Sequence, residues 1–159
     1  MIAVDENRFQ IREVNPGEYI GAMNLAWDTF SKFDARDYSQ EGIDAFRDFI
    51  SDGNLYEMFL RGAYLIYVAV DSNDKLAGVI SIRGGNHISL LFVAEKYQKM
   101  GVATKLIDHV KNKLKEEYKN ITVNAAPYAV GFYHRYGFID TGLEQEQTGI
   151  KYTPMEYLL

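Results

Sequence analysis

The chain has 159 residues, of which 47% are apolar and 25% are charged, which is the composition of a folded globular protein and not of a disordered one. The 22 Asp and Glu residues outnumber the 17 Lys and Arg residues and give a formal net charge of −5, which argues against nucleic acid as the main partner. The sequence contains no cysteine, so a disulfide scaffold, thiolate metal sites and a cysteine nucleophile are excluded.

Nothing in the sequence indicates a membrane protein or several domains. The longest apolar runs, such as residues 64–70, are far shorter than the ~20 residues that span a bilayer. The first residues include Asp5 and Glu6, where a secretory signal carries Lys or Arg. No repeat or Pro/Gly/Ser-rich linker interrupts the chain. We therefore expect a soluble, cytoplasmic protein without membrane contacts, folded as one domain over residues 1–159.

The first third of the chain predicts one strand and two helices. A short strand at 9–14 ends at the Asn-Pro-Gly sequence of residues 15–17. An imperfect apolar stripe at helical spacing predicts a helix over 19–33, and a loop follows at 34–38. A second helix begins after Ser39, whose hydroxyl can cap the free amides, and runs to about residue 50.

The middle of the chain predicts a hairpin followed by a β-α-β unit. Two strands, at 64–71 and 75–82, flank a turn at 72–74. Residues 87–93 are apolar on both faces, which is typical of a central strand. A helical stripe over about 99–118 and a buried strand at 121–125 complete the unit, and its crossover should be right-handed.

The last elements are a short helix and two strands. The helix spans 128–135 and ends at Gly137, and the strands lie at 138–143 and 149–158. The predicted class is therefore α/β or α+β with a mixed sheet.

The junction of the central strand with the long helix predicts an anion site. The segment 93–104 places Gly101 and Ala103 in the first helical turn, where free amides and the helix dipole favour a phosphate group. Lys99 adds a positive charge. Neither the P-loop pattern nor the dinucleotide G-x-G-x-x-G pattern is present. An ordinary helix start that contains a glycine remains the alternative for this pattern alone.

Three motifs in order resemble the GNAT superfamily of acyl-CoA-dependent N-acetyltransferases. Gln98, Gly101 and Ala103 match [QR]-x-x-G-x-[GA], and the strand residues 90–93 precede that match. Residues 132–138 match F-Y-x-x-x-G-F. The tail is similar to that of a bacterial subgroup with a Gly-Ile-x-x-x-Pro-Met ending, here residues 149–155. The match is good from about residue 65 onward and rests on element order alone before it.

The resemblance implies a fold and a co-substrate. It implies a mixed, mostly antiparallel sheet of six to seven strands, splayed around a central β-α-β unit and flanked by about four helices, with acetyl-CoA in the cleft. The backbone of 91–93 would pair with the pantetheine amides, and the amides of 99–104 would hold the pyrophosphate. The residues expected to bind acetyl-CoA are Leu91, Phe92, Val93, Gln98, Lys99, Met100, Gly101, Val102, Ala103, Thr104 and Asn124. This chain departs from the commonest pattern by having Gln98 in place of Arg, Met100 before the glycine and Ala103 in place of a second Gly.

Acetyl transfer to an amine requires a group that gives a proton to the departing thiolate. A tyrosine holds its proton at pH 7, because its reference pKa is ~10. The resemblance assigns this general-acid role to Tyr133, the tyrosine of F-Y-x-x-x-G-F. It also implies that a backbone amide near Val93 stabilises the oxyanion.

The amine must also lose a proton, and His87 is the candidate base. A His with a pKa of ~6.5 is mostly neutral at pH 7 and can accept a proton. Strand alternation puts its side chain on one face with those of residues 89, 91 and 93. A histidine that only bonds a neighbour is the alternative, and Glu144, Asp28 or a water chain are further candidates. No metal is expected, because three scattered His residues form no H-x-x-x-H pair and His109 and His134 are expected on exposed helix faces.

The predicted reaction is acetyl transfer to a primary amine, on a small molecule or on a peptide or protein, by direct attack in a ternary complex. Aromatic and acidic side chains of the first helices are candidates for recognising a cationic amine: Trp27, Phe30, Phe33, Asp34, Asp37 and Tyr38. Trp27, Phe30, Phe46 and Phe49 can equally fill the core. The alternative functions are an acyl-CoA-binding sensor without turnover and a purely structural domain. The final strands are candidates for a homodimer contact.

Overall fold

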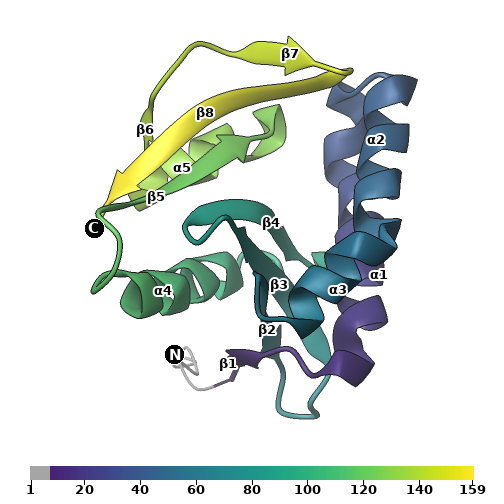
Figure 1. The fold of residues 1–159 in the computed structure, drawn as a ribbon, viewed down its shortest axis with the longest axis vertical. Helices are drawn as coiled ribbons and strands as arrows, with labels where there is room; N and C mark the ends of the chain where they lie inside the picture. The colour runs from purple at the N-terminus through teal and green to yellow at the C-terminus, as the bar shows by residue number, and fades with distance from the viewer. Residues whose placement is uncertain (1–7) are drawn as a thin grey trace, which may run out of the picture.

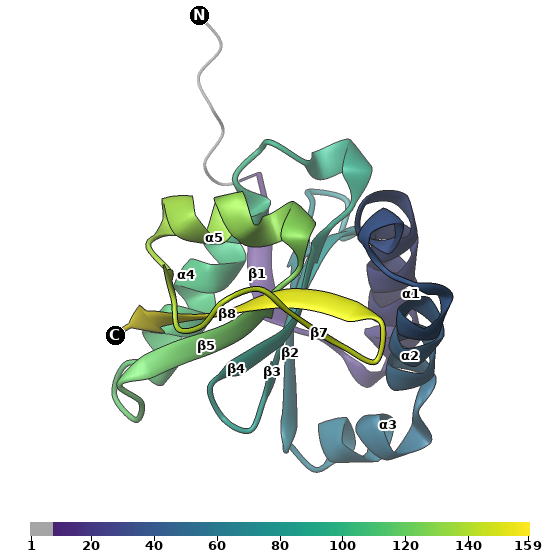
Figure 2. The same ribbon diagram turned by 90° about the horizontal axis from the view of Figure 1, so that it is seen from above.

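The computed structural model describes residues 8–159, so that Asp5 and Glu6, which count against a secretory signal, lie outside the described part. A twisted sheet runs through the molecule with helices on both sides (Figures 1 and 2). Its strand order is β1-β2-β3-β4-β5-β8-β6, and β7 pairs with β8. No helix within residues 8–159 is long and apolar enough to cross a membrane.

The described strands outnumber the six to seven that were expected. They are β1 (Gln10–Glu13), β2 (Tyr64–Val70), β3 (Leu76–Arg83), β4 (His87–Val93), β5 (Asn120–Ala125), β6 (Ile139–Asp140), β7 (Gln145–Gln147) and β8 (Ile150–Leu158). Strand β7 has no apolar pattern that could predict it, because its three side chains are all polar and exposed. The predicted strand at 138–143 shrinks to the two residues of β6.

The number of α-helices is five in the described chain, against about four expected. They are α1 (Tyr19–Thr29), α2 (Gln40–Ser51), α3 (Gly53–Leu60), α4 (Val102–Leu114) and α5 (Val130–Tyr136). The unpredicted helix is α3, which is only eight residues long and buries a single residue, Leu55. Its start is nonetheless capped, because the Asp52 side chain accepts a hydrogen bond from Asn54 N at 2.9 Å. The predicted Ser39 cap of α2 is present, with Gly42 N donating to its Oγ.

Two apolar clusters hold the helices on opposite faces of the sheet. In Figure 2, α4 and α5 lie on one side of β2–β4, and α1, α2 and α3 lie on the other. The first cluster joins α4 to β5 and to Tyr133 of α5. The second joins α1 to β2, β3 and β4, and includes Tyr64, whose hydroxyl bonds Ser81 and Ser89. The first cluster therefore connects the α4 side of the molecule with β5 and α5, and the second holds the first three helices on the sheet.

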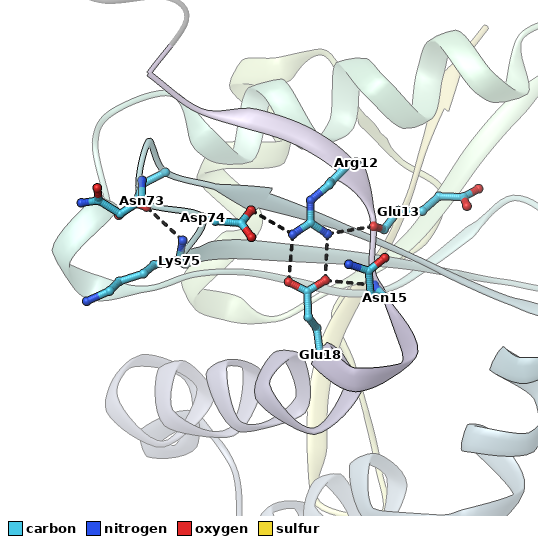
Figure 3. A network of polar contacts seen from close by, with 8 residues as sticks. Arg12, Glu13, Asn15, Glu18, Asn73, Asp74 and Lys75 are labelled. Atoms are coloured by element: carbon cyan, nitrogen blue, oxygen red, sulfur yellow. Dashed lines mark hydrogen bonds and ion pairs between the residues drawn. The ribbon is translucent and has the colours of Figure 1, made fainter.

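The N-terminal strand is tied to the rest by one arginine (Figure 3). The Arg12 guanidinium donates to both carboxylate oxygens of Glu18, at 2.7 and 2.9 Å, and to Asp74 at 3.2 Å. Glu18 also accepts from Asn15 N, and these bonds, that to Arg12 foremost, lower its pKa to about 2. The network connects β1, the turn before α1 and the β2–β3 turn, far from the site described next.

The splay expected around the central β-α-β unit is confirmed, and it lies between β4 and β5. The parallel pair β4–β5 is matched at only two positions, His87 with Thr122 and Ile88 with Val123. Beyond Ile88 the two strands separate, and β5 continues with β8 as its partner (Figure 1). The edge of β4 that faced β5 is therefore open over its second half.

The strict alternation expected along β4 is wrong. The register with β3 pairs Ile82 with Ile88 and Ser81 with Leu90, so that Ser89 is an extra residue, a β-bulge. As a result Ile88 lies in the core cluster of α4, whereas Leu90 lies in the opposite one. The bulge occurs where β4 parts from β5, and it turns the second half of β4 relative to the first.

Candidate active site

The loop before α4 is held in place by its own side chains. Tyr97, in a short 3₁₀ turn at Glu95–Tyr97, donates to Asp71 Oδ2 at 2.6 Å and so anchors the loop on the β2–β3 turn. The Gln98 side-chain amide donates to the Val93 carbonyl at 3.1 Å. The departure from the family's usual Arg therefore gives a residue that closes the loop onto the end of β4.

The same loop turns through two left-handed residues. Lys99 has φ 63° and Gly101 has φ 81°, and α4 begins at Val102 with no side chain capping it. The first amides of a helix have no partner within the helix, so these are free to bind an anion together with the helix dipole. Left-handed backbone is unusual for Lys99 and is accommodated without cost at Gly101.

A cleft of about 560 Å³ opens beside this loop. It is lined by residues of β4, of the loop and α4 start, and of α5 and the turn before it, together with Thr29 and Asp34. All the residues predicted to bind acetyl-CoA line it except Met100 and Asn124. Met100 is 41% exposed and turned toward Arg8, whose guanidinium lies 3.4 Å from its sulfur. Asn124 lies on the wall of a second cavity.

The backbone beside the cleft offers free hydrogen-bonding groups. Ala94 N donates to Ala77 O of the β3 side at 2.9 Å. Because successive residues of a strand point their polar groups to opposite edges, Val93 and Leu91 turn theirs to the open edge of β4. A chain of amides such as pantetheine can therefore be added to this edge, followed by a pyrophosphate at the α4 amides. The groups present suit acyl-CoA in polarity, with strand-edge groups for its amides and helix amides for its pyrophosphate.

The second cavity, of about 370 Å³, has aromatic walls. Its rings include Phe30, Tyr38, Phe46, Phe49 and Phe92. Phe30 and Phe46 stack with ring centroids 4.1 Å apart, so they belong to the packing and to the cavity wall at once. The predicted roles in amine recognition and in core packing therefore each fit some of these aromatic residues. Trp27 and Phe33 line neither cavity.

The two cavities meet at a small group of shared residues. Those that line both are Asp34, Leu91, Phe92, Ala129 and Tyr133. Tyr133 is 4% exposed, and its ring packs edge-on against Phe132 and Phe138. Its hydroxyl has no hydrogen-bond partner within residues 8–159. Burial, and then the charge of Asp34, raise the pKa of this phenol, so it stays protonated at neutral pH.

His87 lies away from that junction. Its Nδ1 is 2.7 Å from Thr122 Oγ1, and burial and the neighbouring Arg83 lower its pKa. His87 lines only the second cavity and precedes Leu91 by four residues, roughly 13 Å along a strand at about 3.3 Å per residue. The geometry thus separates the two residues predicted to be catalytic, and direct contact of His87 with a group held at Tyr133 is not favoured.

The other titratable candidates lie elsewhere. Glu144 and Asp28 are exposed and line neither cavity. His134 is exposed as expected, but the expectation for His109 is wrong, because its ring packs on Tyr67 at 4.8 Å where α4 crosses the sheet. The described part of the chain holds no cluster of three His, Asp or Glu residues arranged for a metal ion.

Of the residues that the sequence offered for recognising a cationic amine, Asp34 is the one that lines both cavities. The periodicity predicted a loop from this residue on, whereas α1 runs into a π-helical turn at Phe30–Asp34. A π-turn carries one residue more than an α-turn and often occurs at functional sites. Here it brings Asp34 to the junction of the cavities. Burial, reinforced by Asp37, raises the pKa of this carboxyl to about 7.

The comparisons with known proteins agree with this architecture. Residues 34–159 match the family model described as Acetyltransferase (GNAT) domain. The uncharacterized N-acetyltransferase YafP of Escherichia coli K12 is 30% identical over 132 residues, which cover 83% of this chain and 82% of YafP. A GCN5-related N-acetyltransferase structure from Rhodopseudomonas palustris superposes with a TM-score of 0.80 at 23% identity, covering 94% of this chain and 95% of that one. The PaiA N-acetyltransferase of Thermoplasma acidophilum, solved in complex with coenzyme A, gives 0.76 at 19% identity, covering 95% and 99%.

Proposed function

This chain belongs to the GNAT family of acyl-CoA-dependent N-acyltransferases, and from that premise we propose that it moves an acetyl group from acetyl-CoA to a primary amine by direct attack in a ternary complex. The observation that carries the proposal is the meeting of two differently built cavities at Tyr133. One has an open strand edge and free helix amides, and the other has an aromatic lining. Two substrates held in these cavities would have their reactive ends side by side.

On the cofactor side, acetyl-CoA supplies the thioester that is broken. Leu91 and Val93 offer their backbone groups to its pantetheine arm, and the amides from Lys99 to Thr104 offer theirs to the pyrophosphate. The open-edge N–H of Val93 or Leu91 is also suited to bind the thioester oxygen, on which negative charge develops. Gln98 keeps the loop closed beside them.

At the junction, Tyr133 gives its proton to the thiolate of coenzyme A as the C–S bond breaks. A raised pKa suits this role, because the phenol is fully protonated before the reaction. The absence of any partner within residues 8–159 leaves the hydroxyl available to the sulfur. His87, at the far end of the second cavity, fits acceptor recognition better than proton transfer.

A thermal unfolding scan with and without acetyl-CoA, followed by a thiol-release assay with a panel of primary amines, tests the proposal. At a hundred-fold excess over Kd, binding adds ~2.7 kcal/mol and raises Tm by roughly 5–11 °C. Thiol release that requires an amine is the expected second result. A Tm shift without amine-dependent thiol release would contradict turnover and support a sensor, and no shift at millimolar acetyl-CoA would contradict the proposal altogether.

A further inference from the structure

The carboxylate of Asp34 is buried without a partner. It is 8% exposed, and it makes no hydrogen bond or ion pair with any residue from 8 to 159. Over the same residues the Tyr19 hydroxyl is the one buried side-chain polar atom both sealed from solvent and unbonded. The Asp34 oxygens therefore reach open space, which is that of the two cavities it lines. An unpaired buried carboxylate is costly, so a cationic ligand is the partner that this position lacks.

No neighbouring charge fills that place. Its own turn supplies Arg36, Asp37 and Tyr38, but the Arg36 guanidinium lies over the Tyr128 ring, 5.5 Å from the centroid. Asp37 adds negative charge near Asp34, and Arg36 only partly offsets it. From α5, Tyr133 faces Asp34 across the junction. The β4 residues at the junction, Leu91 and Phe92, are apolar.

The second cavity has opposite electrostatic character at its two ends. Asp34 lies at the junction, whereas His87 and its strand neighbour Arg83 line the other end. Between them the wall is aromatic, and Asp34 is the only carboxylate of the described chain that lines this cavity. A second ammonium group at the far end would meet Arg83 instead of a carboxylate.

We propose that Asp34 binds the ammonium group of the acceptor and takes its proton, and that the acceptor is a monoamine with an aromatic or apolar body lying along Phe30, Phe46 and Phe49. This inference rests on the proposed acetyl transfer and adds to it the base and the substrate class. It replaces His87 as the group that prepares the amine.

The proton balance closes within the site. The ammonium gives one proton to the Asp34 carboxylate, and the nitrogen lone pair forms the C–N bond at the thioester carbon. The C–S bond breaks, its electron pair leaves on sulfur, and Tyr133 protonates the thiolate. The second nitrogen proton returns to the Tyr133 phenolate, so the products are the amide and free thiol. Asp34 then releases its proton to solvent.

The test compares wild type with Asp34→Asn, Asp34→Glu and the control Asp28→Asn, an exposed carboxylate that lines neither cavity. The probes are 2-phenylethylamine and spermidine, with kcat/KM from thiol release between pH 5.5 and 9. Wild type should prefer 2-phenylethylamine, and its activity should fall below pH 7, where Asp34 becomes protonated. Asp34→Asn should lose about 100-fold or more in kcat/KM and lose that acidic limb, with Asp34→Glu recovering part of both.

Two further measurements separate this inference from the proposed function. Acetyl-CoA affinity should be equal in wild type and Asp34→Asn, which also shows that the variant is folded. Titration calorimetry of 2-phenylethylamine, with and without coenzyme A, should show at least ten-fold weaker binding by Asp34→Asn. If wild type transfers acetyl groups but Asp34→Asn matches Asp28→Asn, or spermidine is preferred, the inference is wrong and the function stands. If no transfer occurs at all, equal or absent amine binding by the two proteins overturns the inference as well.

Discussion

The cleft proposed to bind acetyl-CoA (the cofactor cleft) and the second cavity, proposed to bind the amine (the acceptor cavity), share their junction. The two are assembled in different ways. The cleft takes most of its wall from one continuous segment, β4, the loop after it and the first turn of α4. The cavity takes its wall from the π-turn, α2, β4, β5 and the start of β8, which are far apart in the chain. The cleft presents backbone groups whose position depends on local turns, whereas the cavity presents side chains whose position depends on how distant elements pack.

The difference also shows in what each side costs the fold. The groups that the cleft offers are backbone amides at a helix start and a strand edge, which remain solvated before a ligand binds. The cavity instead holds Asp34, a carboxylate whose pKa is raised mainly by burial. The acceptor cavity thus contains a group that destabilises the folded state. In the proposed function this group is needed to bind the amine.

Removal of the Asp34 charge should change the stability of the protein more than any other substitution considered below, and it should increase it. The Asp34 carboxyl has an ordinary pKa of 3.8 and about 7 in the folded protein. Between these values the folded state binds more protons, so stability falls as pH rises from about 4 to about 7 and the penalty is complete above that. Asp34→Asn should therefore raise the free energy of unfolding at pH 8, by at most about 4 kcal/mol at ~1.36 kcal/mol per pKa unit. The variant should accordingly unfold at a higher temperature than wild type at that pH.

Thermal unfolding at pH 4 and pH 8 checks this prediction. The gain from Asp34→Asn should be largest at pH 8 and small near pH 4, where the carboxyl is protonated in the folded state and about half ionised in the unfolded chain. Asp28→Asn provides the matched control and should leave the pH dependence as in wild type. A lower Tm for Asp34→Asn at pH 8 would mean that Asp34 stabilises the fold, contrary to this account.

A second prediction concerns the contact between α2 and the turn before β8, beside the acceptor cavity. Gly42 of α2 packs against the turn before β8, where an added Cβ would lie 2.3 Å from the Gly149 carbonyl oxygen. Because the neighbour is backbone, Gly42→Ala should push β8 from α2 and cost about 1–3 kcal/mol, the usual range for overpacking. Ile150, next to this contact, lines the acceptor cavity, so KM for the amine should rise while acetyl-CoA affinity holds.

Gly53→Ala is the control for that substitution, since a Cβ at Gly53 meets nothing within 4 Å and its φ is not positive. Denaturant titration and steady-state kinetics of both variants supply the comparison. Equal loss of amine and acetyl-CoA binding in Gly42→Ala would show that the two cavities are not independently built.

A substitution in the cofactor cleft should weaken the binding of acetyl-CoA and not that of the amine, and it should cost less stability. A Cβ at Gly101 meets no atom within 4 Å, but the residue has φ 81°. Gly101→Ala should therefore cost only the conformational strain of about 1–2 kcal/mol, in the loop that carries the helix amides. Acetyl-CoA affinity measured by calorimetry should fall about ten-fold while KM for the amine changes little. A rise in the amine KM as large as that in Gly42→Ala would erase the distinction between the two sides.

The features that the sequence predicts are those built from local segments, and the features that it does not predict depend on how distant elements pack. The bounds of β4, the β-α-β unit, the Ser39 cap and the loop at Gly101 are all visible in local patterns, and the structure contains them. The bulge at Ser89 is not visible, because it is a property of the register with β3 and not of either strand alone. Asp34 is visible in the sequence only as one of six candidates for binding a cation, and its burial at the junction is hidden for a related reason. The π-turn that positions it has no periodic signature, and its burial depends on α5 and β4, which come much later in the chain.

The proposed acetyl transfer takes place where the two cavities meet, with Tyr133 as the acid. The most direct measurement is single-turnover acetyl transfer by Tyr133→Phe, paired with the Kd of acetyl-CoA for the same variant. Phe keeps the packing against Phe132 and Phe138 and removes only the hydroxyl. We expect a rate lower by about 100-fold or more at an unchanged Kd. Equal losses in rate and affinity, or a rate within a few-fold of wild type, would contradict it.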